Sequence, residues 1–507
     1  MSLIGLDLGT SGARAIAIDD NAQILATATQ SYPLATPRPG WTEQNPETWW
    51  AASQAVLQTV MSAVPDRPAA LGLTGQMHGA VFLDAQDQVI RPAILWNDQR
   101  TARQCQAITE LVGAERLVAV TGNPALTGFQ APKILWLRDE EPSAYAKVRS
   151  VLLPKDYVRL RLTGLRATDA SDASGSLLLD LRKRDWSDDI LAQLRIPRDW
   201  LPTIHESPEV TGTVSVDAAR TTGLPAGLPV TAGGGDNAAA AIGNGIIQTG
   251  ILSSSIGTSG VVFAHTDDAT IDPKGRLHAF CHAVPDAYHL MGVTLAAGGS
   301  LQWWREVTGA ALSYDAMTAA AAQVPPGSEG LVFLPYIYGE RTPHLDPLAR
   351  GAFMGLSNRH SAAHLTRAVM EGVVYGLKDS LDLIASLAVP VTKIRATGGG
   401  ARNQLWLQLQ ADVFGLPVYR SRVDEGPAFG AALLAGVAGG VFRSVAEACG
   451  NVELDSEMTA PDPARHRVYD QYRSAFADLY PAAAPVMHRL ADLGSQDRGT
   501  DPNDRIG

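Results

Sequence analysis

Cysteine is scarce in this chain of 507 residues, which contains only Cys105, Cys281 and Cys449. Their number is odd, they lie far apart and none has CxxC spacing. The sequence therefore indicates neither a disulfide framework nor a zinc site. This cysteine usage predicts a reducing, cytoplasmic setting.

Long apolar runs and an excess of basic charge are also lacking. The apolar stretch at the N-terminus is interrupted by Asp7, and no run of about 18 apolar residues occurs elsewhere. We therefore expect a protein that is neither exported nor membrane-spanning. The formal net charge of −11 disfavours binding to nucleic acid or to an anionic membrane.

The tetrapeptide Gly-Thr-Ser-Gly occurs twice, at 9–12 and at 257–260, each time after an apolar, strand-like run. Glycines let backbone N–H groups turn inward as an anion-binding nest, and the Thr and Ser hydroxyls add donors to phosphate oxygens. Such turns also recur by chance in a chain with 48 glycines. Two copies at strand ends, half a chain length apart, indicate internal duplication.

The length fits two domains of roughly 250 residues. We predict an N-terminal domain over residues 1–247, a C-terminal domain over 248–490 and a polar, mobile tail over 491–507. Strands are expected at 3–8, 13–18 and 23–29, and a hairpin is expected from 81–83 and 89–95. An Asn-Pro-Glu start predicts a helix from Asn45.

Two acidic residues stand out beside the glycine-rich turns. Asp7 ends the strand before the first Gly-Thr-Ser-Gly copy, where a divalent cation would sit; alternatively it satisfies the adjacent turn. Asp236 follows three glycines and opens an Asn-Ala-rich helix, whose polarity should keep the carboxylate ionised and ready to accept a proton. The alternative for Asp236 is a simple helix N-cap.

Taken together, the Asp7 strand, the paired turns and the Gly398–Gly400 loop resemble the actin-like ATPases. That resemblance implies an α/β protein of two ribonuclease-H-like domains that close over ATP in an interdomain cleft. Residues 351–356 with 364–371, and residues 131–136, resemble the signatures of the FGGY carbohydrate kinases. The likeness runs from residue 3 to about 445. Gln130 departs from the signature, which usually has Pro, Ser or Thr there, and could alter the sugar pocket beside Phe129.

Further segments resemble the branch of this family that phosphorylates D-xylulose: 75–80, 96–98, 153–157, 233–237 and 339–344. Glycerol kinases carry Arg-Glu where this chain has Met77-His78, so a small triol is not expected. The resemblance implies ATP-dependent conversion of D-xylulose to D-xylulose 5-phosphate, with Mg²⁺ as cofactor.

The same resemblance implies a role for each matching residue. Asp236 would be the catalytic base, and the sugar would be bound by Met77, His78, Asp236 and Asn237, although a Met-His pair by itself is usually packing. Asp7 would hold Mg²⁺ through water. The nucleotide would be bound by Thr10, Ser11, Gly257, Thr258, Gly298, Gln302, Gly399, Gly400 and Asn403, the last three receiving the adenine. Arg341 is equally compatible with an interdomain ion pair.

Two alternatives remain. One is a kinase for a related ketose or pentitol, such as ribulose or arabinitol; the other is a nucleotide-switched binding protein of the actin or chaperone type. The expected partners are the sugar and ATP, with no nucleic acid and no membrane, and the sequence leaves a homodimer open.

Overall fold

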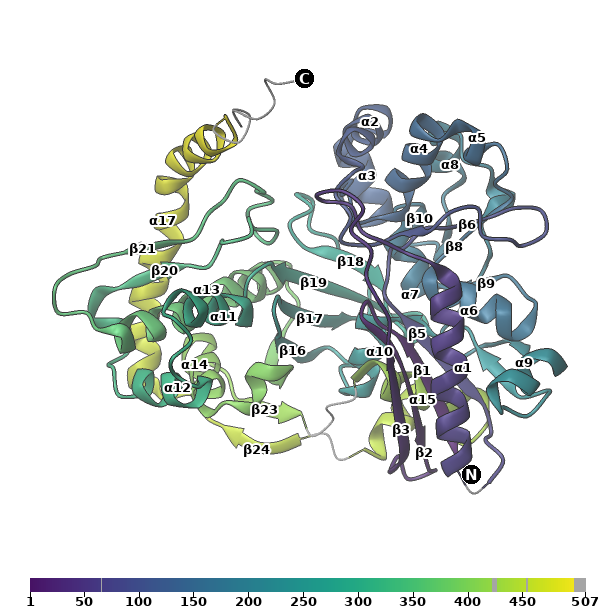
Figure 1. Cartoon of the computed structure of the whole chain (residues 1–507). Helices are drawn as coiled ribbons and strands as arrows, with labels where there is room; N and C mark the ends of the chain where they lie inside the picture. The colour runs from purple at the N-terminus through teal and green to yellow at the C-terminus, as the bar shows by residue number, and fades with distance from the viewer. Residues whose placement is uncertain (65, 422–425, 453–454, 497–507) are drawn as a thin grey trace. The chain divides into compact units, whose positions relative to one another are not determined.

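The computed structural model describes residues 1–64, 66–421, 426–452 and 455–496 (Figure 1). The chain forms two compact units. Unit 1 holds residues 1–249, 265–290 and the described part of 423–454; unit 2 holds 250–264, the described part of 291–422, and the described residues from 455 onward. The domain limits expected from the sequence stay predictions. Of the expected tail, residues 491–496 continue α17 (Pro463–Gln496), and the remainder lies outside the described residues.

The main sheet of unit 1 has the order β13-β14-β5-β1-β2-β3, with β15 also paired to β5. Strands β1, β2 and β3 are antiparallel neighbours, β5 runs parallel to β1, and β14 runs parallel to β5. Strands β1, β2 and β3 confirm the three strands expected at the N-terminus. The bounds are β1 (Leu3–Leu8), β2 (Gly12–Ile18), β3 (Ile24–Ser31), β5 (Leu71–Gly75), β13 (Val210–Thr213), β14 (Pro229–Thr231) and β15 (Gly234–Gly235).

Helices cover both faces of this sheet. α1 (Pro46–Ala63) begins as expected, because the Asn45 side chain accepts a hydrogen bond from the Glu47 amide. It packs with α6 (Pro154–Thr163) and α9 (Val216–Thr222) over one apolar face (Figure 1). α10 (Asp236–Gly243) and α15 (Gly426–Ala438) contribute to the other core. A Cβ on Gly430 would lie 1.8 Å from the Ala239 carbonyl oxygen, so glycine allows α15 to press directly on α10.

The hairpin expected from 81–83 and 89–95 is wrong in its pairing. β6 (Val81–Leu83) pairs with β8 (Ser150–Leu152), and β7 (Ala93–Ile94) pairs with β4 (Glu43–Gln44). A single bridge, Leu83 to Val89, links the two expected partners. Each of the two segments thus pairs with a strand from a more distant part of the sequence and not with its neighbour. The other elements of unit 1 are α2 (Ala102–Val112), α3 (Ala114–Thr121), α4 (Gln130–Glu140), α5 (Pro142–Tyr145), β9 (Ala167–Asp169), α7 (Ala170–Ala173), β10 (Leu179–Asp180), β11 (Asp185–Trp186), α8 (Asp188–Leu194), β12 (Thr203–His205), β18 (His278–Cys281) and α16 (Val445–Gly450).

Unit 2 repeats the strand order of unit 1. Its sheet runs β19-β17-β16-β22-β23-β24. As in unit 1, the strand before the Gly-Thr-Ser-Gly turn pairs antiparallel with the next strand and parallel with a later one, and an antiparallel pair ends the sheet. This shared topology supports internal duplication. The bounds are β16 (Gly250–Ile256), β17 (Gly260–Thr266), β19 (Tyr288–Thr294), α11 (Gly298–Val307), α12 (Tyr314–Ala322), β20 (Val332–Leu334), β21 (Ala352–Met354), α13 (Ala362–Ser386), β22 (Val391–Thr397), α14 (Gln404–Phe414), β23 (Val418–Ser421) and β24 (Asp455–Thr459).

None of the helices in the part of the chain that the structure describes combines the length and the apolar composition needed to cross a membrane. All three cysteines are buried and free of disulfides.

Candidate active site

Three parallel strands of unit 1 end in register at one edge of the sheet. Asp7 of β1 and Gly234 of β15 both lie opposite Thr74 of β5, and Gly235 lies opposite Gly75. The segments that leave these strands begin with the first Gly-Thr-Ser-Gly turn, with Gln76-Met77-His78 and with Asp236-Asn237. The sheet therefore gathers the predicted cation, sugar and base residues from three distant parts of the chain, at the edge where α/β proteins usually bind ligands.

Asp236 is the first residue of α10, and the N-cap position belongs to Gly235, which excludes the N-cap alternative. Its Oδ1 accepts hydrogen bonds from the Asn237 amide at 2.7 Å and from Asn237 Nδ2 at 2.9 Å. Burial raises the pKa of Asp236 to about 6, although both bonds act in the opposite direction. Asp236 is therefore more basic than an ordinary aspartate but still ionised at neutral pH, in line with the expectation from the sequence.

Asp7 is half-buried, and its Oδ1 is buried without a hydrogen-bond partner among the described residues. Burial, reinforced by the charge of Asp236, raises the pKa of Asp7 to about 7, against the opposing effect of Arg14. The adjacent turn does not need Asp7, since the Gly9 amide donates to the Gly12 carbonyl at 3.0 Å. A buried carboxylate oxygen left unpaired fits a cation ligand.

No group of three His, Cys, Asp or Glu residues within the described ranges could hold a metal ion. A cation at Asp7 would therefore have few carboxylate, imidazole or thiolate ligands from the described residues, which leaves positions for water and phosphate. Such sparse protein ligation is typical of Mg²⁺ at phosphoryl-transfer sites.

Neighbouring side chains hold the first Gly-Thr-Ser-Gly turn. Trp96 Nε1 donates to Thr10 Oγ1 at 2.9 Å, and Gln44 Nε2 donates to the Thr10 carbonyl at 2.7 Å. The Tyr32 hydroxyl donates to the Gly9 carbonyl at 2.5 Å. Ser11 is exposed. The Thr10 hydroxyl thus already has a donor, and sequence reasoning missed Trp96, which it had noted only as part of a motif.

Met77 is buried, whereas His78 is half-buried with a positive φ of 68°. The Nδ1–H of His78 donates to the Gly175 carbonyl at 2.6 Å, and Phe129 meets the imidazole edge to face at 4.9 Å. Gln130 Nε2 donates to the Gly79 carbonyl at 3.0 Å, so the residue that departs from the family signature braces the turn after His78.

A hollow of about 440 Å³ in unit 2 gathers the remaining predicted residues. Seven of them line it: Gly257, Thr258, Gly298, Gln302, Gly399, Gly400 and Asn403. The other lining residues, which sequence reasoning missed, are Ile256, Leu301, Tyr314, Asp315, Thr318, Arg402 and Trp406. Thr10 and Ser11 belong to unit 1.

Two of the glycines that line this hollow have no room for a side chain. A Cβ on Gly298 would lie 2.5 Å from the Gly257 carbonyl oxygen, and one on Gly400 would lie 2.6 Å from Ile256 Cβ. A Cβ on Gly399 would meet nothing within 4 Å. Gly399 therefore leaves space in the hollow, whereas Gly298 and Gly400 allow its walls to approach each other.

Asn403 has a structural task beside any contact with a ligand. Its Oδ1 accepts from the Trp406 amide at 3.2 Å as the N-cap of α14, and its Nδ2 donates to Thr318 Oγ1 at 2.9 Å. Gln302 Nε2 donates to Glu306 Oε1 at 2.9 Å within α11. The amide of Asn403 thus joins α14 to α12 across the wall of the hollow.

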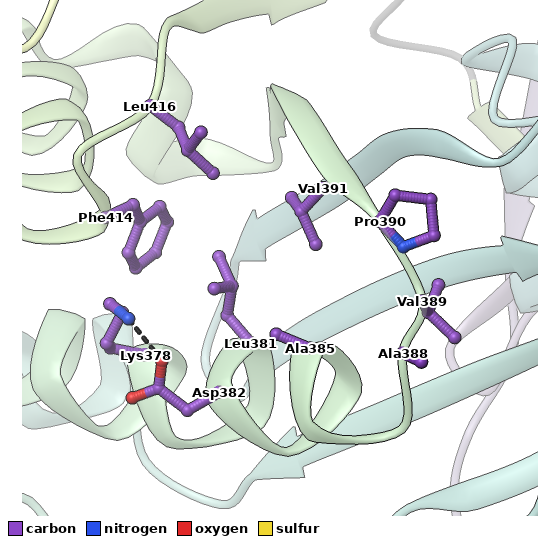
Figure 2. Close-up of a pocket in the computed structure, with 10 residues that line it drawn as sticks. All are labelled: Lys378, Leu381, Asp382, Ala385, Ala388, Val389, Pro390, Val391, Phe414 and Leu416. Atoms are coloured by element: carbon purple, nitrogen blue, oxygen red, sulfur yellow. Dashed lines mark hydrogen bonds and ion pairs between the residues drawn. The ribbon is translucent and has the colours of Figure 1, made fainter.

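A second hollow of unit 2, about 430 Å³, contains none of the predicted site residues (Figure 2). Leu381, Val391 and Phe414 face its interior, and Lys378 pairs with Asp382 at its edge. Its lining is mostly apolar and lacks the glycine-rich turns, so we do not assign it to the reaction.

Two family models together match most of the chain. The N-terminal domain of the FGGY family of carbohydrate kinases matches residues 2–243, and the C-terminal domain of that family matches residues 252–439.

The chain is also similar to individual members of this group. It is 42% identical to the xylulose kinase of Escherichia coli (strain K12) over 490 residues, which covers 96% of this chain and 99% of the relative. A crystal structure of a xyloylose kinase from Brucella ovis matches with a TM-score of 0.91 at 37% identity, covering 96% and 100% of the two chains. A xylulose kinase structure from Rhodospirillum rubrum matches with the same TM-score at 32% identity, again covering 96% and 100%. These matches confirm the expected two-domain α/β fold of the actin-like ATPase and sugar kinase type.

Proposed function

Because the chain belongs to the FGGY family of carbohydrate kinases, we propose that it transfers the γ-phosphoryl group of ATP to D-xylulose and forms D-xylulose 5-phosphate. The observation that carries the proposal is the meeting of Asp7, His78 and Asp236 at one edge of the unit 1 sheet. The choice of sugar is supported by relatives at about 40% identity that are themselves named xylulose kinases.

Asp236 is the proposed general base. Its carboxylate takes the proton of the attacking sugar hydroxyl as that oxygen bonds to the γ-phosphorus. A pKa of about 6 suits this task, since the group is ionised at neutral pH yet more basic than an ordinary aspartate. Phosphoryl transfer depends mainly on positioning and charge neutralisation, so a base of this strength suffices.

Met77, His78 and Asn237 are the proposed sugar-binding neighbours of Asp236. Met77 supplies an apolar wall, and the polar groups of His78 and Asn237 serve the sugar hydroxyls. His78 is held for this role by Gly175 and Phe129. The Arg-Glu pair of glycerol kinases is absent, which favours a longer sugar.

ATP is proposed to occupy the 440 Å³ hollow of unit 2, with its base against Gly399, Gly400 and Asn403 and its phosphates toward Gly257 and Thr258. Gly298 and Gln302 contact the ribose or the phosphates, and Thr10 and Ser11 of unit 1 serve the transferred phosphate. Asp7 holds Mg²⁺, which when bound neutralises charge on the phosphates. Asp7→Asn should therefore raise the Mg²⁺ concentration needed for half-maximal rate while sugar binding persists.

The transfer requires the sugar on unit 1 and the nucleotide on unit 2 to meet. We propose that closure of the two domains achieves this and excludes water from the γ-phosphate. A cytoplasmic location and a homodimer stay predictions.

The test is a panel of pentuloses and pentitols, including ribulose and arabinitol, assayed for ADP formation with purified protein. We expect the highest kcat/KM for D-xylulose, and loss of turnover in Asp236→Ala. A higher kcat/KM for another sugar would show that D-xylulose is not the preferred substrate, while the assignment as a sugar kinase would stand. If no sugar raises ATP turnover while a peptide or polymerisation does, the chain is a nucleotide-switched binding protein instead.

A further inference from the structure

A cluster of charged side chains lies fully buried behind the proposed sugar site. α6 contributes Lys155, Asp156 and Arg159, and the β9–α7 segment contributes Asp169 and Asp172; each side chain has 0% of its surface exposed. Lys155 Nζ lies 2.7 Å from Asp156 Oδ1, 2.8 Å from Asp169 Oδ1 and 3.2 Å from Asp172 Oδ2. Burying so much charge costs free energy, and the proposed reaction uses none of it directly.

Opposite charges face one another within the cluster. Burial lowers the pKa of Lys155, but the three surrounding carboxylates outweigh it and raise that pKa overall, so the lysine is charged. Burial raises the pKa of Asp172 well above its ordinary value. Lys155 and Arg159 are the two cations that face these carboxylates.

One arm of the cluster reaches the residue before Asp236. Ser171 Oγ donates to Asp169 Oδ2, and the Gly235 amide donates to Ser171 Oγ at 3.1 Å. Ser207 Oγ also donates to Asp169 Oδ2, at 3.3 Å. Gly235 is the N-cap of α10 and lies opposite Gly75 of β5, and Ser171 adds a side-chain anchor for its amide.

The other arm holds the start of the same glycine-rich segment. Arg159 donates to the carbonyls of Thr231 and Ala232, and to Thr211 Oγ1 at 2.6 Å. Between the two anchors lie Gly233 and Gly234. The cluster thus adds an anchor at each end of the glycine-rich segment, which β15 also ties to β5.

We propose that Asp169 and Ser171, held by Lys155, are positioning residues that fix the Gly235 amide and thereby aim the Asp236 carboxylate at the sugar hydroxyl. The inference rests on the proposed role of Asp236. The next turn of the same segment supports His78 through the Gly175 carbonyl, so one buried element braces both the base and the sugar site. A misplacement of about 1 Å in such a group can cost about 100-fold in rate.

Ser171→Ala is the direct test, because it removes one hydroxyl and leaves the charges in place. We expect kcat to fall about 10- to 100-fold, while KM for the sugar and for ATP changes less than about twofold. Ser171→Thr, which keeps the hydroxyl, should recover most of kcat. Ser53→Ala is the matched control, since Ser53 is equally buried in unit 1 but donates only to the Trp49 carbonyl of its own helix.

A double-mutant cycle separates this inference from the proposed function. Adding Ser171→Ala to Asp236→Ala should have no further effect, because the group to be aimed is gone. If Asp236→Ala keeps more than a tenth of kcat, the proposed role of Asp236 as general base fails. If Asp236→Ala is inactive but Ser171→Ala keeps wild-type kcat, even with a lower Tm, the positioning role alone is refuted.

If Ser171→Ala folds poorly, Ser207→Ala is tested in its place, because it removes only the longer hydrogen bond to the Asp169 carboxylate. A three- to tenfold loss of kcat at unchanged KM is then expected. Unchanged kcat would overturn the proposal.

Discussion

Replacing Asp236 by asparagine should inactivate the enzyme and yet stabilise it at neutral pH. The carboxylate has a pKa of about 6 in the folded protein against an ordinary value of 3.8. Below pH 3.8 both folded and unfolded chains hold the proton, so the group imposes no penalty. Between pH 3.8 and about 6 the unfolded chain releases the proton while the folded chain still holds it. The free energy of unfolding therefore falls as pH rises through this range.

Above pH 6 the penalty is constant. A shift of about two pKa units corresponds to about 3 kcal/mol, and because the side chain is only half-buried we expect a gain of about 1 to 3 kcal/mol from Asp236→Asn. At about 2 °C per kcal/mol for a large domain, Tm should rise by about 2 to 6 °C at pH 8. The gain should shrink below about 1 kcal/mol at pH 4.

The assay is thermal unfolding at pH 4, 6 and 8 in EDTA without ligands, alongside kcat at pH 8, which should fall by about 10² to 10⁴. Asp188→Asn is the matched control, since Asp188 is also the first residue of its helix but lies exposed. Asp188→Asn should lower the free energy of unfolding by a few tenths of a kcal/mol and should not raise it at high pH. A lower Tm for Asp236→Asn at pH 8 would refute the reasoning, because Asp236 would then be a stabilising first-turn acid.

Three further results are expected. His78→Ala should raise KM for the sugar up to about tenfold with KM for ATP unchanged; equal changes would mark His78 as structural. Gly399→Val should raise KM for ATP at least about tenfold by filling the hollow, whereas Gly450→Ala, in equally open space, should not. Calorimetric titration should show a non-hydrolysable ATP analogue tightening D-xylulose binding about 5- to 150-fold, and reciprocally; identical dissociation constants would argue against closure.

Local signals predicted much of this fold. The apolar run before the first turn gave β1 residue for residue, the Asn45 start gave α1, and Asp236 begins its helix as expected. These features depend on residues that are near each other in the chain, such as a cap and the amide two residues later. The failed hairpin at β6 shows the limit, because its true partner β8 lies far along the sequence.

The buried charges could not be predicted from the sequence. Lys155 and Arg159 stand in an otherwise apolar stretch, where charged residues would ordinarily mark an exposed helix face. Their burial depends on Asp169 of β9 and Asp172 of α7, which come into reach only in the folded chain. Likewise, Tyr314 and Asp315 enter the hollow of unit 2 because α12 packs there, and no motif in their segment indicates it.

The repeated turn shows how far a shared sequence reaches into function. Both copies follow a strand in the same sheet position, but their hydrogen bonds differ. The Gly9 amide donates to the Gly12 carbonyl, whereas the Gly257 amide donates to the Ser259 carbonyl, each at 3.0 Å. The first copy follows Asp7 and is fixed by Trp96, while Thr258 of the second lines a hollow with glycines around it. The two copies thus share a position in the sheet but not a backbone hydrogen-bond pattern. These different neighbours are consistent with the proposed roles, a cation and the transferred phosphate at the first copy and the nucleotide at the second.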